Sequence, residues 1–293
     1  MRRTHKMFCS ETRKPGMTHT DTPVVDVWAQ QPDDDFLENE IFEPLMRWQD
    51  DDISLELPLD WTVQAYESAG VDTALVSAWW GPEGEMLSNE HVAGTVEKHP
   101  ELFVGVGSVP LDEPMEAVRT VRRCVNDHGF VGIRAIPWLW ELPPDDRRYY
   151  PVYSECVEQN VPFCLQVGHT GPLKPSETGR PIPYLDNVLR EFPDLTVVAG
   201  HIGHPWTEEM IALATKYEDV YIDTSAYKPK RYPDELVEFM KGHGREKVIF
   251  GTNYPMIQPG DCLGGIDSLD LNDETERLFL HENAERAFGT DLV

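Results

Sequence analysis

The sequence predicts an α/β fold, a single (β/α)₈ TIM barrel in which eight parallel strands alternate with helices. Short apolar runs alternate with longer amphipathic runs from Val24 onward, and the short runs are nearly continuous, as in a parallel sheet buried on both faces. Eight such pairs fit into the roughly 270 residues that remain, which is typical of this barrel. An open doubly wound sheet would place a glycine-rich turn after an early strand, and the sequence has none there.

Apolar runs of strand length mark the eight predicted strands, each followed by a helical pattern. In chain order the strands are predicted over 24–30, 72–80, 102–109, 129–138, 161–169, 195–203, 220–226 and 247–254. Apolar residues at helical spacing predict helices, of which the clearest are 112–127, 205–217, 233–243 and 273–288.

Residues 23–293 are predicted to form one domain, because the sequence shows neither a linker nor an internal repeat inside 24–293. Residues 1–22 are basic but have no apolar centre, so they do not resemble a secretory signal. We expect them to be a disordered lead-in, and the sequence leaves open whether they are translated in the native protein.

The charge balance excludes whole classes of partner. The chain has 52 acidic and 25 basic residues, a formal net charge of −27, whereas nucleic acids and anionic membranes bind basic surfaces. We therefore expect a small-molecule substrate, with no nucleic-acid or membrane partner. The acidic residues are spread along the chain, which favours a protein from a salt-adapted, halophilic organism. An ordinary acidic cytoplasmic protein is the alternative.

The five cysteines show no CxxC spacing and no disulfide density. They indicate free thiols in a reducing compartment, so the predicted localisation is cytoplasmic. No apolar stretch of the sequence approaches the length of a membrane span.

The ends of the predicted strands carry the candidate site, because the active site of such a barrel lies at the C-terminal ends of its strands. These ends are polar and rich in aromatic residues, and period-two alternation places Asp26, Trp28 and Gln30 on one face of the first strand. In chain order the strand-end residues are Asp26, Trp28, Gln30, Trp79, Trp80, Ser108, Arg134, Trp138, His169, His201, His204, Asp223, Ser225, Asn253 and Tyr254.

Four of these side chains have more than one interpretation. His169 either caps a loop or acts in the site, whereas the glycines beside His201 favour a metal ligand or a general acid/base. Arg134 lies in a buried strand and requires a carboxylate partner, either Asp26 or Asp223 in the protein or a carboxylate of the substrate. Asp223 is a base, the partner of Arg134, or a loop cap. His204 precedes a proline and is interpreted as a rim residue.

Four runs resemble one known family: LTVVAGHIGHPWTEEM (195–210), VYIDTSAY, KVIFGTNYPM and FLHENAERAFG. In order and spacing they are similar to the amidohydrolase-related family, a group of metal-dependent hydrolases of TIM-barrel fold that includes aminocarboxymuconate-semialdehyde decarboxylase. The resemblance extends from the first strand to the closing helix, and it implies the same barrel.

The resemblance also implies a metal site, which this sequence has altered. In the family, a histidine-containing pair on strand one, a histidine ending strand five and an aspartate after strand eight hold one divalent metal, usually zinc. His169 matches the strand-five ligand and His201 the strand-six histidine that activates water. Trp28, Gln30 and Asn253 replace the other ligands. Tryptophan has no lone pair for a metal and amides are weak neutral donors, so we expect no cofactor or a weakly held divalent metal.

Two hypotheses of function follow. The first is an amidohydrolase-related hydrolase, decarboxylase or other lyase that acts on a small carboxylated or cyclic substrate, with hydrolysis, decarboxylation and hydration all open. The second is a non-catalytic barrel that binds a small molecule or serves as a subunit; a homodimer is compatible with either. In the first, His201, Asp223 and Arg134 are catalytic, and the residues expected to bind substrate are Trp28, Gln30, Trp80, Trp138 and Asn253.

The segment 138–150 (WLWELPPDDRRYY) follows the fourth predicted strand and has two interpretations. Its aromatic residues and arginines suit a lid over the mouth of the barrel. The alternative is a solvated loop in which the DDRR run forms surface ion pairs.

Overall fold

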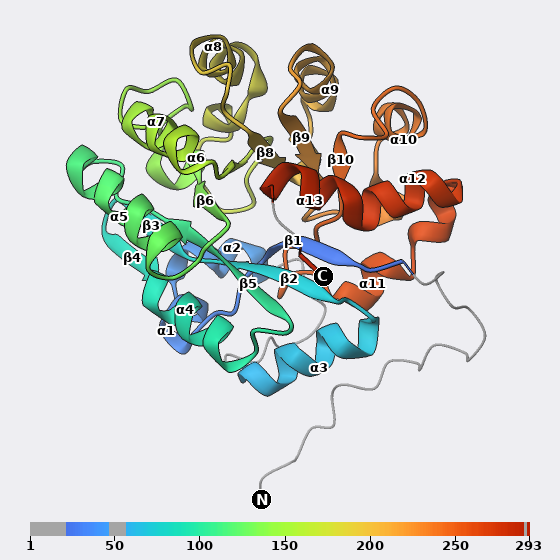
Figure 1. The fold of residues 1–293 in the computed structure, drawn as a ribbon, viewed down its shortest axis with the longest axis horizontal. Coiled ribbons are helices and arrows are strands. Elements are labelled where there is room, and N and C mark those ends of the chain that lie inside the picture. Colours follow the sequence, from blue (N-terminus) through green and yellow to red (C-terminus); the bar gives the residue numbers. More distant parts are fainter. Residues whose placement is uncertain (1–21, 47–56, 290–291) are drawn as a thin grey trace, which may run out of the picture.

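Eight parallel strands pair in chain order in the computed structural model, which describes residues 22–46, 57–289 and 292–293 (Figure 1). Residues 1–21 of the predicted lead-in lie outside the described residues. The last strand returns to the first through a bridge between Ala29 and Tyr254, and the Gln30 N–H donates to the Tyr254 carbonyl at 3.0 Å. The predicted barrel is thus confirmed. Its strands are β1 Val25–Ala29, β2 Thr73–Ser77, β5 Phe103–Ser108, β6 Gly132–Ala135, β7 Phe163–Gln166, β8 Val197–Gly200, β9 Val220–Asp223 and β10 Val248–Ile249.

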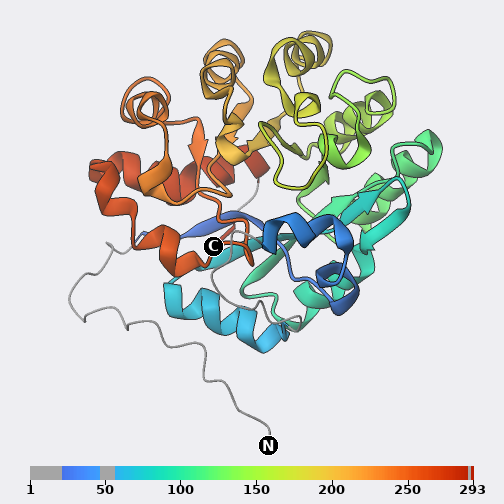
Figure 2. The ribbon, with the colours of Figure 1, turned by 180° about the vertical axis from the view of Figure 1, so that it is seen from behind.

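Helices surround the sheet, as the two opposite views show (Figures 1 and 2). Three predicted helices are confirmed, and the predicted helix 273–288 is interrupted by a π-helical turn at Leu278–Glu282. In the part of the chain that the structure describes, no helix is long and apolar enough to cross a bilayer. The helices are α1 Asp34–Leu37, α2 Glu43–Met46, α3 Leu59–Ala69, α4 Asn89–Lys98, α5 Pro114–Asn126, α6 Pro137–Trp140, α7 Tyr150–Gln159, α8 Asp186–Glu191, α9 Thr207–Lys216, α10 Asp234–Lys241, α11 Pro259–Leu263, α12 Asp273–Arg277 and α13 Asn283–Phe288.

Helix α5 illustrates how the sequence builds one unit of the barrel. It begins with a proline, which lacks the N–H that would be unpaired in a first turn. Its buried residues Ala117, Val121 and Cys124 follow helical spacing and form the face that packs on the sheet. A Cβ at Gly107 of β5 would lie only 2.6 Å from the Cys124 sulfur, so glycine there allows the helix to approach the strand closely.

The barrel has one addition that the sequence did not reveal, an antiparallel hairpin of β3 (Trp79–Gly81) and β4 (Gly84–Leu87). The predicted strand 72–80 joined two strands, because Trp79 and Trp80 continue the apolar run beyond the end of β2. In the structure Trp79 instead packs edge-on against Phe36 and Trp138, with ring centroids 5.2 and 6.1 Å away.

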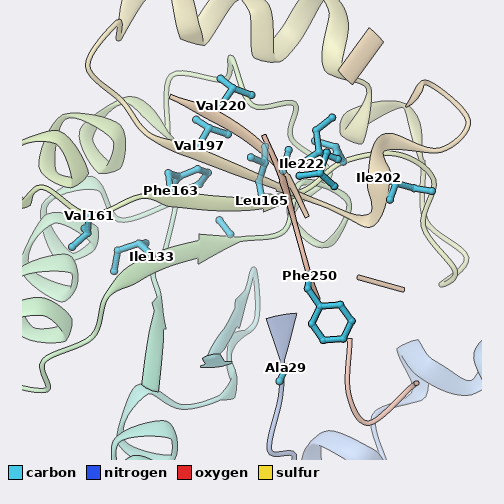
Figure 3. Close-up of a cluster of buried hydrophobic side chains, with 14 of the residues drawn as sticks. Ala29, Ile133, Val161, Phe163, Leu165, Val197, Ile202, Val220, Ile222 and Phe250 are labelled. Atoms are coloured by element: carbon cyan, nitrogen blue, oxygen red, sulfur yellow. The ribbon is translucent and has the colours of Figure 1, made fainter. Parts of the chain in front are cut away.

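Two layers of apolar side chains form the core. The outer layer lies between strands and helices and includes Phe163, Ile222 and Phe250 (Figure 3). The inner layer fills the barrel with Val25, Leu75, Val106, Cys164, Val198 and Ile249, and the Ala284, Ala287 and Phe288 side chains of α13 join it. A Cβ at Gly132, the first residue of β6, would lie 3.2 Å from the Phe288 ring. Helix α13 therefore closes the end where the strands begin, and the polar strand ends lie at the other end.

Asp26 corrects the expectation that it shares a face with Trp28 and Gln30. The register of β1 shifts between Asp26 and Ala29, and the Asp26 carboxylate accepts a hydrogen bond at 3.0 Å from Tyr66 of α3. It also accepts from the Trp28 N–H at 3.1 Å and from the Thr252 N–H and hydroxyl at 2.9 and 2.5 Å. Burial raises the pKa of Asp26 to about 6, and the donors from Thr252, Trp28 and Tyr66 oppose that rise. The ionised carboxylate ties β1 to the segment after β10.

We predict that Asp26→Asn lowers the free energy of unfolding by about 2 kcal/mol or more, because an amide nitrogen would face donors that now find an acceptor. Urea denaturation monitored by circular dichroism measures this loss. Asp194→Asn is the matched control, since Asp194 is exposed in the turn before β8. Equal stability of the two variants would contradict a role for Asp26 in closing the barrel.

Candidate active site

Backbone strain gathers at the C-terminal end of the barrel. His201, Ala226 and Asn253 follow β8, β9 and β10, and they have φ angles of 71°, 67° and 67°. Residues with a Cβ rarely adopt this left-handed conformation, and the surrounding structure must hold them in it. Three such residues at successive strand ends mark this end of the barrel as the candidate active site.

His201 is linked to a buried carboxylate through a serine. Its Nδ1 lies 2.7 Å from the Ser225 hydroxyl, which in turn donates to Asp223 Oδ2 at 2.9 Å. The Ser225 N–H donates to the other oxygen of Asp223 at 2.8 Å. Because Nδ1 is engaged, Nε2 is the ring nitrogen left for a ligand, and His201 keeps 9% of its surface exposed.

The pKa values of His201 and Asp223 are shifted in opposite directions from their usual values. Burial, with Arg134 and His169 nearby, lowers the pKa of His201 to about 3. Burial raises the pKa of Asp223 to about 7, although the Ser225 hydrogen bonds and Arg134 oppose the rise. His201 is therefore neutral at physiological pH, whereas Asp223 titrates close to neutrality.

Arg134 lies inside the barrel with no exposed surface. Its guanidinium carbon is 3.5 Å from the centroid of the Trp28 ring, and it donates to the Ser77 hydroxyl and, at 3.1 Å, to the Val27 carbonyl. These hydrogen bonds go to a hydroxyl and a carbonyl, not to the carboxylates of Asp26 or Asp223 that the sequence suggested. The stacked indole takes part of the role expected of a carboxylate, because an aromatic face attracts a desolvated cation.

Trp28 is almost fully buried, and its indole contacts the His201 ring as well as Arg134. The Trp28 and His201 ring centroids are 5.1 Å apart, and a Cβ at Gly200 would lie 2.5 Å from the indole. Glycine at the end of β8 therefore makes room for the tryptophan. This contact explains the glycine that the sequence places before His201.

The predicted substrate-binding residues lie at this end of the barrel with different exposures. Gln30 is buried, and its amide nitrogen lies 3.4 Å from the side-chain oxygen of Asn253. The residue Asn253 is partly exposed. Trp80 is partly buried. Trp138 is 3% exposed, and its indole N–H donates to Gln166 at 2.6 Å. Asn253 and Trp80 are thus the more accessible members, whereas Gln30 and Trp138 are buried.

Sequence reasoning missed Gln166, which ends β7. Its side-chain amide joins Trp138 to the His169 carbonyl, the latter at 3.3 Å. The signal was present, because Gln166 lies two residues beyond Cys164 and so shares the interior face of the strand. The apolar run around it concealed that signal.

His169 and His204 lie together on the rim. Both are exposed, the His169 N–H donates to the His204 carbonyl at 2.7 Å, and their ring centroids are 5.9 Å apart. The His204 ring also lies 6.0 Å from that of Tyr227, a residue that the sequence did not single out. These rings give the rim two imidazoles and a phenol within reach of one small ligand.

The segment 138–150 combines features of both interpretations. Helix α6 buries Trp138, Leu139 and Trp140, while the Arg148 side chain pairs with Asp146 at 2.8 Å. The ion pair is the one expected of a solvated loop. Trp138 of the same segment instead packs beside the candidate site, where its indole N–H donates to Gln166.

The donor atoms at the family's metal position do not suit a divalent cation. Trp28 offers its ring to Arg134, the Asn253 oxygen faces the Gln30 amide, and Nδ1 of His201 faces Ser225. Within residues 22–46, 57–289 and 292–293, no group of three or more His, Cys, Asp or Glu side chains is placed to hold a metal. His169 and the Nε2 atom of His201 remain as nitrogen donors, and two imidazoles alone do not hold a divalent metal tightly.

Comparisons with known proteins find a matching family and solved structures of the same fold. A family model described as Amidohydrolase matches residues 26–290. Gamma-resorcylate decarboxylase from Rhodococcus jostii (strain RHA1) is 26% identical over 258 residues, 70% of this chain and 76% of that protein. An uncharacterized TIM-barrel protein from Bordetella bronchiseptica superposes with a TM-score of 0.79 at 24% identity, over 91% of this chain and 98% of the other. A dihydroxybenzoic acid decarboxylase from Polaromonas sp. JS666, with manganese and the inhibitor 2-nitroresorcinol, gives 0.65 at 17%, over 92% and 97%.

We predict that the protein purified without chelator, then dialysed against zinc or manganese, retains far less than one metal ion per chain. The double variant Gln30→His with Asn253→Asp supplies two ligands of the right type beside His169, and we expect it to retain close to one. Elemental analysis of both proteins measures the difference. A stoichiometric metal in the unaltered protein would show that the site has donors other than those described.

Proposed function

We propose that this chain, which belongs to the amidohydrolase family, is a lyase that decarboxylates a small carboxylated ring compound by proton transfer. Two similarities support the choice of reaction: the Rhodococcus relative is named a gamma-resorcylate decarboxylase, and the Polaromonas structure is that of a dihydroxybenzoic acid decarboxylase. Loss of carbon dioxide from such a compound requires one proton and no attacking water. The donor set described above fits this chemistry better than it fits a metal-bound nucleophile.

The observation that carries the proposal is the arrangement of His201. A residue with a Cβ is held at a φ of 71°, its Nδ1 is fixed by Ser225, and its Nε2 is left available. A neutral imidazole of this kind suits a general acid/base, because one ring nitrogen exchanges a proton with the ligand while the other is held by a hydrogen bond. A histidine that served only packing would not require the strained backbone.

The reaction needs few groups. His201 Nε2 delivers a proton to the ring carbon that bears the carboxylate. The bond between that carbon and the carboxylate then breaks, its electron pair stays on the ring, and carbon dioxide leaves. Gln30 and Asn253 bind oxygen substituents of the ring, and the exposed imidazoles of His169 and His204 bind the carboxylate.

The aromatic residues define the shape of the substrate. Trp80 is partly exposed beside the site, and Trp138 is fixed behind it by Gln166. A flat ring between aromatic walls gains contact area and excludes water. Trp28 supports His201 from within, so in this proposal it shapes the pocket without covering the substrate.

Arg134 acts in this proposal as a positioning residue. With no exposed surface it has no contact with a ligand at the barrel mouth, but it stacks on Trp28 and helps to lower the pKa of His201. Its cation adds to the effect of burial, which keeps the imidazole neutral, and it stacks on the indole that contacts the His201 ring. The catalytic role predicted for Arg134 becomes an electrostatic one.

A hydrolytic or hydrating reaction and a non-catalytic binding protein remain distinct alternatives. Hydrolysis and hydration both require a water positioned against the substrate by a base, and His201 has an available nitrogen for that purpose. The buried Trp28–Arg134 stack favours the binding protein, because it fills the interior where a reactive group would otherwise lie. Turnover of substrate separates these alternatives directly.

We predict that the purified protein converts gamma-resorcylate or a related carboxylated phenol to the decarboxylated ring, and that His201→Gln lowers kcat by about 100-fold to 10,000-fold. Chromatographic detection of the product measures both. His243→Gln is the matched control, because His243 is exposed and precedes β10, at the opposite end of the barrel.

Tight binding of these compounds without turnover would support the non-catalytic alternative. Equal activity of the two histidine variants would remove His201 from the mechanism. Thermal unfolding of both variants shows whether any loss of activity reflects a loss of fold.

We also infer a cytoplasmic protein, compatible with a homodimer, that is adapted to concentrated salt. The net charge of −27 supports the adaptation to salt, because like charges on the folded surface repel one another and salt screens them. We predict that the temperature of unfolding rises in about 1 M KCl, where the screening length is about 3 Å. Sucrose of equal osmolality is the control for general exclusion of solute. A lower unfolding temperature in KCl would count against salt adaptation.

A further inference from the structure

Three polar side chains form a hydrogen-bonded series that runs from the mouth of the barrel to its interior. The His201 ring is followed by the Ser225 hydroxyl at 2.7 Å and by Asp223 Oδ2 at 2.9 Å. Ser225 and Asp223 are fully buried, whereas His201 keeps part of its surface exposed. A Cβ at Gly251 would lie 2.1 Å from Asp223 Oδ1, so glycine in the segment after β10 also makes room for this carboxylate.

The hydroxyl between the two groups has a single proton, and this fixes how the series is arranged. When Asp223 is ionised, Ser225 donates to it, and His201 Nδ1 must then be the protonated nitrogen. Nε2 is bare and acts as a base. When Asp223 carries a proton, it donates to Ser225, Ser225 donates to Nδ1, and Nε2 carries the proton and acts as an acid.

We propose that Ser225 is a positioning residue that relays a proton between His201 and Asp223, so that the buried Asp223 carboxylate stores the proton that His201 exchanges with the substrate. The inference rests on the proposed function for its reaction, and it deepens that function by assigning the source of the proton. In the donating direction His201 gives up the Nε2 proton, Nδ1 takes the Ser225 proton, and Ser225 takes the proton of Asp223. One proton leaves the chain, Asp223 becomes a carboxylate, and the imidazole is neutral before and after.

The environment makes Asp223 a better store than His201. His201 faces the Arg134 cation and His169, both of which disfavour a positive imidazolium. Asp223 faces the same Arg134, the Asp26 carboxylate and the Cys164 and Tyr232 side chains, and its own burial outweighs the cation. The proton therefore rests on the carboxylate near neutral pH, while the imidazole changes only its tautomer.

The relay gives a direction for the pH dependence. Asp223, with its pKa raised to about 7, is protonated below that pH and ionised above it. Decarboxylation consumes the stored proton, so kcat falls as the pH rises through about 7. A hydrolase that used His201 as a base would show the opposite trend.

Nitrogen-15 NMR of the histidine-labelled full-length protein tests the relay without any substrate. The His201 signal is assigned by its loss in His201→Gln. We expect the signal to change from the Nε2–H to the Nδ1–H tautomer between about pH 6 and about pH 8, with no imidazolium in that range. In Ser225→Ala this change disappears, and in Ser225→Thr, which keeps a hydroxyl, it returns.

Kinetics on the same variants complete the test. We expect Ser225→Ala to lower kcat about 100-fold with a KM within about 3-fold of the parent, and Ser225→Thr to recover most of the loss. A wild-type tautomer that stays fixed from about pH 6 to about pH 8 overturns the relay whatever the activity. A tautomer that switches in a protein with no turnover supports the relay and counts against the decarboxylase.

Discussion

The stack of the Trp28 indole on the buried Arg134 guanidinium is the interaction on which the candidate site depends. A cation with no exposed surface is expensive unless its charge is compensated, and here a ring face, a hydroxyl and a carbonyl compensate it. The same indole contacts Gly200 and the His201 ring, so the position of the histidine follows from the position of the cation. The strained backbone at His201 holds its ring both beside the indole and within 2.7 Å of the Ser225 hydroxyl.

The barrel divides its two ends between stability and chemistry. Helix α13 closes the end where the strands begin and brings Phe288 against the first residue of β6. At the other end, Asp26 closes the sheet from outside by binding Thr252 and Tyr66. The polar groups between these closures, from Arg134 to Asp223, are held within a rigid frame, and this preorganisation is what a proton-transfer site requires.

The sequence predicted the eight strands, their order and the end of the barrel that carries the polar residues, because buried parallel strands are nearly continuous apolar runs. It also placed His201 and Asp223 at strand ends, since polar residues are conspicuous in such runs, and their catalytic roles remain a proposal. It could not predict that Arg134 stacks on Trp28, because a carboxylate of Asp26, Asp223 or the substrate would also have given the buried guanidinium a partner. The register of β1 shifts after Asp26, so Trp28 joins Val27 on the inside while Asp26 faces outward, and no period-two pattern reveals such a shift. Ser225 appeared among the strand ends, but its place between His201 and Asp223 required coordinates.

In the proposed mechanism, Arg134 supplies the positive charge that a divalent metal would otherwise supply at this end of the barrel. Both place positive charge beside His201 and the buried carboxylates, and two cations together repel each other. At a separation of about 5 Å and an effective dielectric constant of about 20, a divalent ion and a guanidinium repel by about 7 kcal/mol. A histidine at position 28 would both remove the indole that shields Arg134 and invite that metal. In the proposed function, Trp28, Gln30 and Asn253 therefore belong together, because they leave the positive charge of the site to Arg134, an immobile cation inside the barrel, and the proton chemistry to His201.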